Sequence, residues 1–196
     1  VKELLENSID AESKNIELII ENSGKKIIRV IDDGKGMSEK DAEICFQKHT
    51  TSKIKHSEDI FKIMTMGFRG EALASIGMVS ELIVARKTRD SEGKSISVNF
   101  GKKGNIESHG MSFGTTVSVK NIFKNTPARL SFQRRPATEN AKIVDVIVSH
   151  AISNNEVGFK LISDEKTILN IPTSSTTAQI CFGDALAIST INQRKF

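Results

Sequence analysis

A carboxylate and a carboxamide lie one helical turn apart at the beginning of the chain. Glu3 and Asn7 are four residues apart, and in a helix this spacing stacks the two side chains on one face. The carboxylate could take a proton from a water molecule, and the carboxamide oxygen could ligate a hard cation. Taken alone, such a pair is more often the plain polar face of a helix, whose apolar face Leu4 and Leu5 would supply here.

A second candidate follows an apolar strand pattern. Asp32 comes directly after residues 27–31, and a carboxylate at the end of a strand can accept a hydrogen bond from the exocyclic amino group of adenine. Gly34 and Gly36 would let the backbone approach a flat base and adopt a positive φ. Thr115, in a later strand pattern, could bond Asp32 or a water molecule on the base. The alternative is an ordinary Asp-Gly turn and an ordinary strand threonine.

Two further segments could hold phosphate groups. Gly67-Phe68-Arg69-Gly70 precedes a helix of small residues, where free N–H groups and the positive end of the helix dipole form an anion site. Arg69 could add charge to this site or pair with an acidic neighbour. Thr51, Ser52 and Lys53 offer hydroxyls and an ammonium group to the same phosphates, unless they belong to a simple polar loop.

The hydrophobic pattern predicts the elements that would position these residues. An N-terminal helix, a hairpin over 16–20 and 27–31 and a helix over 38–48 precede a small-residue helix over 71–77. The later strands are expected at 81–87, 95–100, 105–109, 115–120, 157–163 and 167–171. Between them lie a short basic helix at Pro127 and a longer helix capped by Thr138 that ends near Ser153.

This order of elements predicts the fold class. Strands that follow one another favour an α+β fold, a two-layer α/β sandwich with a mixed, mostly antiparallel sheet and helices on one face. The phosphate loop G-x-x-x-x-G-K-[ST] does not occur in the 196 residues, so an ATP site would have to be built differently. We expect one domain over 1–172, and a linker with the beginning of another subdomain over 173–196.

Composition and charge limit the possible partners. Apolar residues make up 38% of the chain, but no apolar run approaches the roughly 20 residues that span a bilayer, so no membrane partner is expected. The segment 120–142 contains six basic residues and one acidic residue, Glu139, so its local charge is +5. The basic residues are Lys120, Lys124, Arg129, Arg134, Arg135 and Lys142. The cluster could meet a DNA backbone, and it is equally consistent with a solvated helix face.

The four motifs occur in an order that resembles a known family. Glu-x-x-x-Asn, Asp-x-Gly-x-Gly, Gly-Phe-Arg-Gly and Gly-Thr-Thr resemble the GHKL ATPases, which include type II topoisomerase subunits, a chaperone class, histidine kinases and the MutL mismatch-repair proteins. The detailed resemblance is to MutL. It is carried by residues 2–11, 51–54, 67–76 and 125–129.

The resemblance implies a role for each candidate residue. Glu3 is expected to be the general base and Asn7 the ligand of Mg²⁺, while Glu6 would have a packing or salt-bridge role. Asp32 is expected to recognise the adenine of ATP. The other nucleotide-binding residues are expected to be Gly34, Gly36, Met37, Thr51, Ser52, Lys53, Gly67, Phe68, Arg69, Gly70 and Thr115.

The resemblance also implies a function and partners. We expect a Mg²⁺-dependent ATPase that acts as a switch domain in DNA mismatch repair, with ATP, DNA, a second protomer and a mismatch-recognition protein of the MutS type as partners. Such a protein would be cytoplasmic and nucleoid-associated in a prokaryote, and nuclear in a eukaryote. The family's first helix and a γ-phosphate lysine fall outside this segment, so it should by itself hydrolyse ATP weakly or not at all. The alternatives are another GHKL machine, or a module that binds ATP without turnover.

Overall fold

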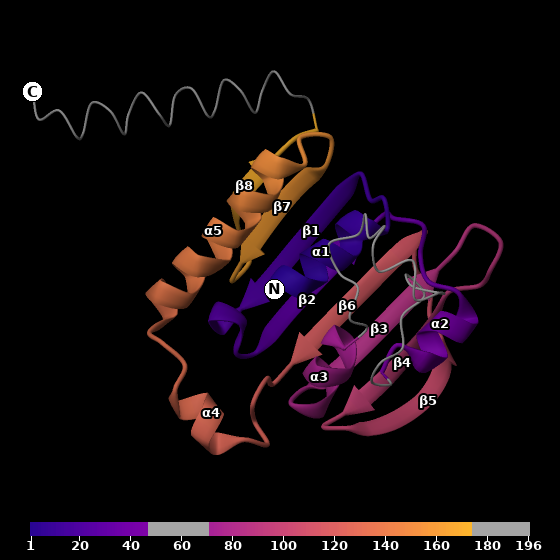
Figure 1. The fold of residues 1–196 in the computed structure, drawn as a ribbon, viewed down its shortest axis with the longest axis horizontal. Helices are drawn as coiled ribbons and strands as arrows, with labels where there is room; N and C mark the ends of the chain where they lie inside the picture. Colours follow the sequence, from indigo (N-terminus) through magenta and orange to yellow (C-terminus); the bar gives the residue numbers. More distant parts are fainter. Residues whose placement is uncertain (47–70, 174–196) are drawn as a thin grey trace, which may run out of the picture.

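A single eight-stranded sheet organises the chain. The computed structural model describes residues 1–46 and 71–173, in which the strands are arranged in the order β5-β4-β3-β6-β2-β1-β7-β8 (Figure 1). β1 and β7 pair in parallel, and every other neighbouring pair is antiparallel. The strands are β1 (Asn15–Glu21), β2 (Ile27–Asp32), β3 (Glu81–Lys87), β4 (Lys94–Asn99), β5 (Lys102–Ser108), β6 (Gly114–Lys120), β7 (Gly158–Ser163) and β8 (Lys166–Ile171).

Helices cover one face of this sheet. In Figure 1, α1 lies over β1 and β2, α3 lies over the neighbouring half of the sheet, and α5 runs along the other edge. The helical segments of the described residues are α1 (Lys2–Asp10), η1 (Asn22–Gly24), α2 (Glu39–Ile44), α3 (Ala72–Met78), α4 (Pro127–Ser131) and α5 (Pro136–Ser153). None of those helices is both long and apolar enough to cross a membrane.

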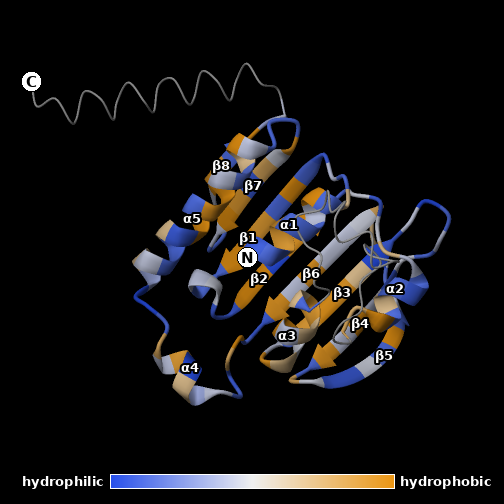
Figure 2. Ribbon diagram, in the orientation of Figure 1, coloured by the Kyte–Doolittle hydropathy of each residue, from blue (hydrophilic) through white to orange (hydrophobic). Residues whose placement is uncertain are grey.

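The core lies between the helices and the sheet. Side chains alternate between the two faces of a strand, so Ile16, Leu18 and Ile20 of β1 all point to the same face, where they are buried. Figure 2 shows hydrophobic and hydrophilic residues in alternation along this strand. Leu4 and Leu5 of α1 pack against them. Burial of an aliphatic side chain of this size contributes about 1.5–3 kcal/mol, so these contacts fix α1 on the sheet.

The predicted fold class is confirmed, and the expected hairpin and strands are present. Two details differ. Thr138 is not the cap of α5, because the N-cap is Arg135, three residues earlier, and Pro136 lies in the first turn, where a missing N–H is harmless. β5 begins at Lys102 rather than 105, and its residues are all exposed, which leaves little hydrophobic pattern to detect.

Ser38 caps α2 as expected, since its hydroxyl accepts a hydrogen bond from the Asp41 amide at 3.1 Å. α2 ends at Ile44, earlier than the predicted helix end at residue 48. Residues from 47 onward in that prediction, and the expected linker and second subdomain from residue 174, lie outside the described residues.

Candidate functional site

Asp32 ends β2 as a buried carboxylate with three donors. The Ser8 hydroxyl lies 2.9 Å from Oδ2, and the amides of Gly34 and Thr115 lie 3.0 Å and 3.3 Å from Oδ1. Only 8% of the residue is exposed. A carboxylate has about four acceptor positions, so one remains for a further donor such as an amino group. Asp32 can therefore recognise a flat ligand by accepting a single hydrogen bond from it.

The charge of this carboxylate is costly in its buried position. Burial raises the pKa of Asp32, and the hydrogen bonds from Ser8, Gly34 and Thr115 lower it part of the way back. The three donors therefore replace the water molecules that would hydrate this carboxylate at the surface, and they favour its ionised form in the buried position. They connect β2 with α1 and β6.

The adjacent Asp33 has a different role. Its carboxylate accepts hydrogen bonds from the Lys14 amide at 2.7 Å, the Asn15 amide at 2.9 Å and the Asn15 side chain at 2.7 Å. Burial alone would raise the pKa of Asp33, but these hydrogen bonds outweigh it and hold the pKa below its ordinary value. Asp33 therefore fixes the beginning of β1, while Asp32 faces the site.

Three glycines allow the backbone to pack closely around Asp32. A Cβ on Gly34 would lie 2.5 Å from Ser13 Oγ and 2.7 Å from the Ala11 carbonyl oxygen. Gly36 has φ +73°, and its Cβ would lie 2.5 Å from the carbonyl oxygen of Lys87. Gly114 has φ +122°, and a Cβ there would overlap the carbonyl oxygen of Asp32. Gly114 was not among the predicted site residues, although it directly precedes Thr115.

The helix α1 brings the other two candidates to the same region. Leu4, Leu5 and Ser8 face the core, whereas Glu3 is exposed and Asn7 is half-buried on the adjoining stripe. The hydroxyl of Ser8 places this helix directly against Asp32. Ser8 was missed from the sequence because serine has no preference for such a position, although its place next to Asn7 was a usable signal.

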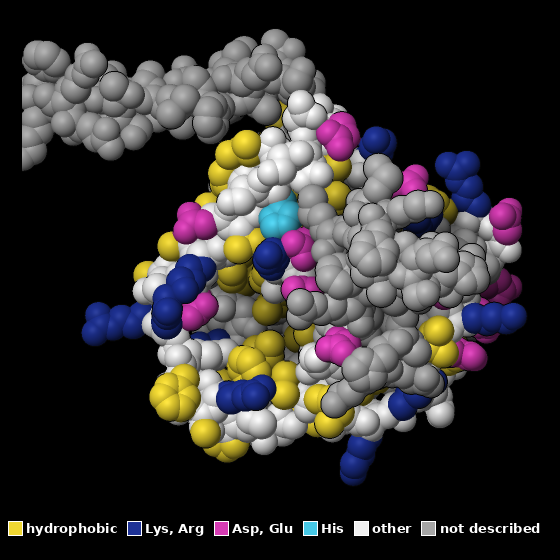
Figure 3. Space-filling model, viewed as in Figure 1, with side chains coloured by type: hydrophobic (Ala, Val, Ile, Leu, Met, Phe, Trp, Pro, Cys, Tyr) yellow, Lys and Arg dark blue, Asp and Glu magenta, His cyan; other side chains and the backbone are white. Residues whose placement is uncertain are grey.

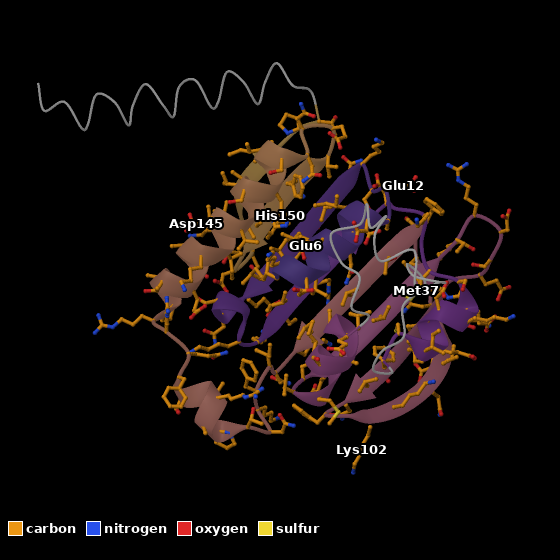
Figure 4. The ribbon with its side chains drawn as sticks, in the orientation of Figure 1. Glu6, Glu12, Met37, Lys102, Asp145 and His150 are labelled. Carbon is orange, nitrogen blue, oxygen red and sulfur yellow. The ribbon has the colours of Figure 1, made fainter. Side chains whose placement is uncertain are left out.

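Glu6 points away from this stripe. Its carboxylate lies 3.8 Å from Nε2 of His150 on α5 and 3.6 Å from Nζ of Lys2, and the side chains of Glu6 and His150 face one another in Figure 4. The other nitrogen of His150 lies 2.7 Å from the Val146 carbonyl oxygen and must donate to it. This agrees with the salt-bridge role expected for Glu6.

The remaining candidates fall into two groups. Thr115 approaches Asp32 through its backbone amide rather than its hydroxyl, and Met37 is a partly buried side chain against the core, near α2 (Figure 4). The predicted phosphate-binding residues lie outside the described residues. They are Thr51, Ser52, Lys53, Gly67, Phe68, Arg69 and Gly70.

Among the described residues, the oxygen donors suit a magnesium ion that is bound together with a nucleotide. Within residues 1–46 and 71–173, no group of three or more His, Cys, Asp or Glu side chains could hold a metal ion. Mg²⁺ is commonly bound by one or two protein oxygens together with phosphate oxygens and water. Asn7 could supply one such oxygen, so the residues present fit a magnesium ion that arrives with its nucleotide.

The basic cluster lies away from Asp32. Lys124, Arg129, Arg134, Arg135 and Lys142 are exposed, and Lys120 is half-buried at the end of β6. Figure 3 shows Lys and Arg side chains around α4 and the beginning of α5. The only acidic side chain in the segment, Glu139, accepts a hydrogen bond from the Arg134 amide at 3.2 Å. The cluster thus presents positive charge to solvent.

Comparison with known proteins agrees with this geometry. A model of the family described as histidine kinase-, DNA gyrase B-, and HSP90-like ATPase matches residues 1–121. The DNA mismatch repair protein MutL of Bacillus mycoides (strain KBAB4) is 43% identical over 180 residues, which cover 92% of this chain and 28% of that protein. MutL of Bacillus anthracis (strain CDC 684 / NRRL 3495) is also 43% identical, with 29% of its length covered. This chain therefore spans less than a third of the length of these relatives.

Solved structures show the same relationship. The Aquifex aeolicus MutL ATPase domain complexed with ADP superposes with a TM-score of 0.71 at 33% identity, over 91% of this chain and 64% of that one. The N-terminal domain of a DNA repair protein gives a TM-score of 0.74 at 31% identity, over 89% and 52% of the two chains. The chain therefore belongs to the histidine kinase-, DNA gyrase B- and HSP90-like ATPase family and, within it, to the MutL type.

Proposed function

We propose that this chain is the Mg²⁺-dependent ATP-hydrolysing switch domain of a MutL-type mismatch-repair protein. The observation that carries the proposal is the buried carboxylate of Asp32, held by three donors beside the helix that presents Glu3 and Asn7. The related Aquifex aeolicus domain was solved in complex with ADP, which supports a nucleotide as the ligand.

Each residue of the site has a chemical role in this proposal. The ionised Asp32 accepts a hydrogen bond from the exocyclic amino group of adenine, and the close packing at Gly34 and Gly36 keeps the adjoining backbone in place. Glu3, exposed on α1, takes a proton from the attacking water molecule. When bound, Mg²⁺ would supply charge stabilisation at the phosphates, and Asn7 would hold it in position.

The phosphates would be bound by residues outside the described part of the chain. We assign this role to Thr51, Ser52 and Lys53 and to the segment 67–70, whose residue types suit phosphate oxygens. The switch itself would consist of ATP-dependent association of two such domains, reset by hydrolysis. DNA, bound through the basic cluster, and a MutS-type protein are the further partners proposed for the whole protein.

Steady-state ATP turnover by the full-length protein tests the proposal. Phosphate release should depend on Mg²⁺ and stop when EDTA removes it. Titration calorimetry should show binding of ATP in preference to GTP, because Asp32 would accept from the amino group at C6 of adenine, where guanine has a carbonyl oxygen. ATP binding with no turnover in the presence of Mg²⁺ would instead identify a binding module. Equal affinity for ATP and GTP would contradict the role of Asp32.

A further inference from the structure

Three buried side chains form a row across the sheet beside the nucleotide site. Thr115 of β6 pairs directly with Asp32 of β2 on one side and with Arg86 of β3 on the other. Directly opposite residues in antiparallel strands point to the same face of a sheet. Arg86 therefore lies on the helix-covered face, two strands from Asp32, where only 3% of the residue is exposed.

A guanidinium group in such a position needs compensation. Nη1 of Arg86 donates to Ser91 Oγ at 3.2 Å, Nη2 lies 4.0 Å from the Glu39 carboxylate, and Nε has no hydrogen-bond partner within the described chain. Leaving a buried charge without a carboxylate partner is strongly unfavourable. Glu39 is therefore the carboxylate partner on which the placement of Arg86 depends, and Arg86 is in turn one of the two cations that hold Glu39.

Glu39 connects this charge to the segment that follows Asp32. It is the first residue of α2, three positions after Gly36 and two after Met37. Lys94 of β4 also bonds its carboxylate, and these two cations hold the pKa of Glu39 below its ordinary value, Lys94 having the larger effect. Gly36 meanwhile packs against the carbonyl oxygen of Lys87, next to Arg86. The end of β3 thus supports the segment 32–39 at two separate points.

We propose that Arg86 is a positioning residue for nucleotide binding, which holds the first turn of α2 through Glu39 and thereby keeps the segment from Asp32 to Met37 in its binding conformation. The inference rests on the proposed nucleotide site. Arg86 does not touch the nucleotide in this proposal. It lowers the fraction of molecules in which the segment has moved off the end of β3. The apparent affinity is proportional to the fraction of molecules that keep the binding conformation.

The test uses four variants of the full-length protein and titration calorimetry with ATP. Arg86→Gln removes the charge and keeps most of the volume. Arg86→Lys keeps the charge, which suffices for a contact that is not bidentate. Glu39→Gln removes the carboxylate that pairs with Arg86, and Glu39 is itself half-exposed. Arg89→Gln is the matched control, since it removes an exposed positive charge in the adjoining loop, where Arg89 lies over the ring of Phe113.

Arg86→Gln should raise the Kd for ATP about tenfold, as expected if about a tenth of the molecules keep the binding conformation. Glu39→Gln should raise it by at least as much, because Arg86 acts through Glu39 and this substitution also removes the charge that Lys94 contacts. Arg86→Lys and Arg89→Gln should stay within about twofold of the parent protein. At saturating ATP, kcat should change little in all four, because the reacting groups are untouched.

A general loss of folding would give a different result. Protein lost to irreversible misfolding lowers the binding stoichiometry and leaves the Kd of the folded molecules unchanged, and this outcome for Arg86→Gln would overturn the proposal. If Arg86→Gln does not fold, Glu39→Gln decides alone: weakened affinity supports the proposal, and parental affinity overturns it. If Asp32→Asn loses ATP binding as expected while Arg86→Gln keeps the parental Kd, the proposed nucleotide site stands and the positioning role of Arg86 is excluded.

Discussion

The hydroxyl of Ser8 lies 2.9 Å from Oδ2 of Asp32 and joins the helix that carries Glu3 and Asn7 to the carboxylate at the end of β2. Both residues are buried, Ser8 with 3% and Asp32 with 8% of its surface exposed. In the proposed function, this hydrogen bond links recognition of the base to placement of the catalytic helix. It also lowers the pKa of a carboxyl group that burial raises.

Removal of that hydroxyl should shift the pH dependence of nucleotide binding. In Ser8→Ala the pKa of Asp32 should rise further, because one of the bonds that favour the ionised form is lost. Binding requires the ionised acceptor, so affinity should begin to fall at a higher pH than in the parent protein as the solution is acidified. Calorimetry between about pH 5 and 8 measures this, since an ordinary Asp titrates near 3.9. Coincident pH profiles would contradict the link.

Asp32→Asn should separate binding from stability. The amide oxygen of Asn can still accept from Gly34 and Thr115, and its NH₂ can donate to Ser8, but no acceptor remains for the adenine amino group. Binding should become undetectable, since an unsatisfied buried donor costs about 1–3 kcal/mol and two donors repel. The melting temperature should not fall, because the cost of a buried charge is removed.

Asp33→Asn is the matched control for that substitution. It should keep nucleotide binding and lose stability at neutral pH. The lowered pKa of Asp33 stabilises the parent protein at pH values above the unfolded-state pKa, and this stability is lost as the pH falls through the folded-state pKa. Asp33→Asn and the parent protein should therefore become equally stable in strong acid. Loss of binding in Asp33→Asn but not in Asp32→Asn would reverse the assignment of the two aspartates.

Substitutions of Glu3 and Asn7 on α1 should have different effects, one on turnover and the other on nucleotide binding. In the full-length protein, Glu3→Ala should retain ATP binding and lose about 10²–10⁴ in kcat, the usual contribution of a general base. Asn7→Ala should instead weaken binding of ATP in the presence of Mg²⁺. Glu6→Gln is the control, because its carboxylate faces His150 rather than the stripe of α1 that carries Glu3 and Asn7. Parental turnover by Glu3→Ala, with loss in Glu6→Gln, would make Glu6 the base.

Gly114 should be intolerant of any side chain. Alanine at this position combines a φ of +122° with an overlap against the carbonyl oxygen of Asp32, so the free energy of unfolding should fall by about 3 kcal/mol or more. Gly110, four residues earlier, has open space around its Cβ position, and Gly110→Ala should stay within about 0.5 kcal/mol of the parent. Urea denaturation of the two variants measures the difference, and equal values would refute the close approach of β6 to Asp32.

The basic cluster should show itself in the salt dependence of DNA binding. Reversal of the charges at Arg134 and Arg135 should weaken binding and reduce the slope of log K against log salt by about one unit for each DNA phosphate that is no longer neutralised. The control is a double reversal at Lys102 and Lys166, which are exposed on the two edge strands β5 and β8. An unchanged slope, or an equal change in the control, would leave the cluster as a solvated surface.

Local sequence determined much of this protein by itself. The spacing of Glu3 and Asn7 places them on one stripe of α1 because helical geometry depends only on neighbouring residues. The alternation through Val30 and Asp32 in β2 puts both side chains on the buried face, which already distinguishes Asp32 from Asp33. The order of strands and helices predicted the class of fold, since the hairpin partners are adjacent in the chain.

Only the tertiary structure decided how the site is held together. Two of the three donors to Asp32, the Ser8 hydroxyl and the Thr115 backbone amide, come from residues 24 positions before it and 83 positions after it, and no local pattern marks either residue as a partner of Asp32. The need for glycine at position 114 arises from a carbonyl group on a different strand. Arg86 looks like one more strand residue until the register of β3, β6 and β2 aligns it with Asp32. Side chains signal their own burial, but their partners are set by sheet register, which is a property of the whole chain.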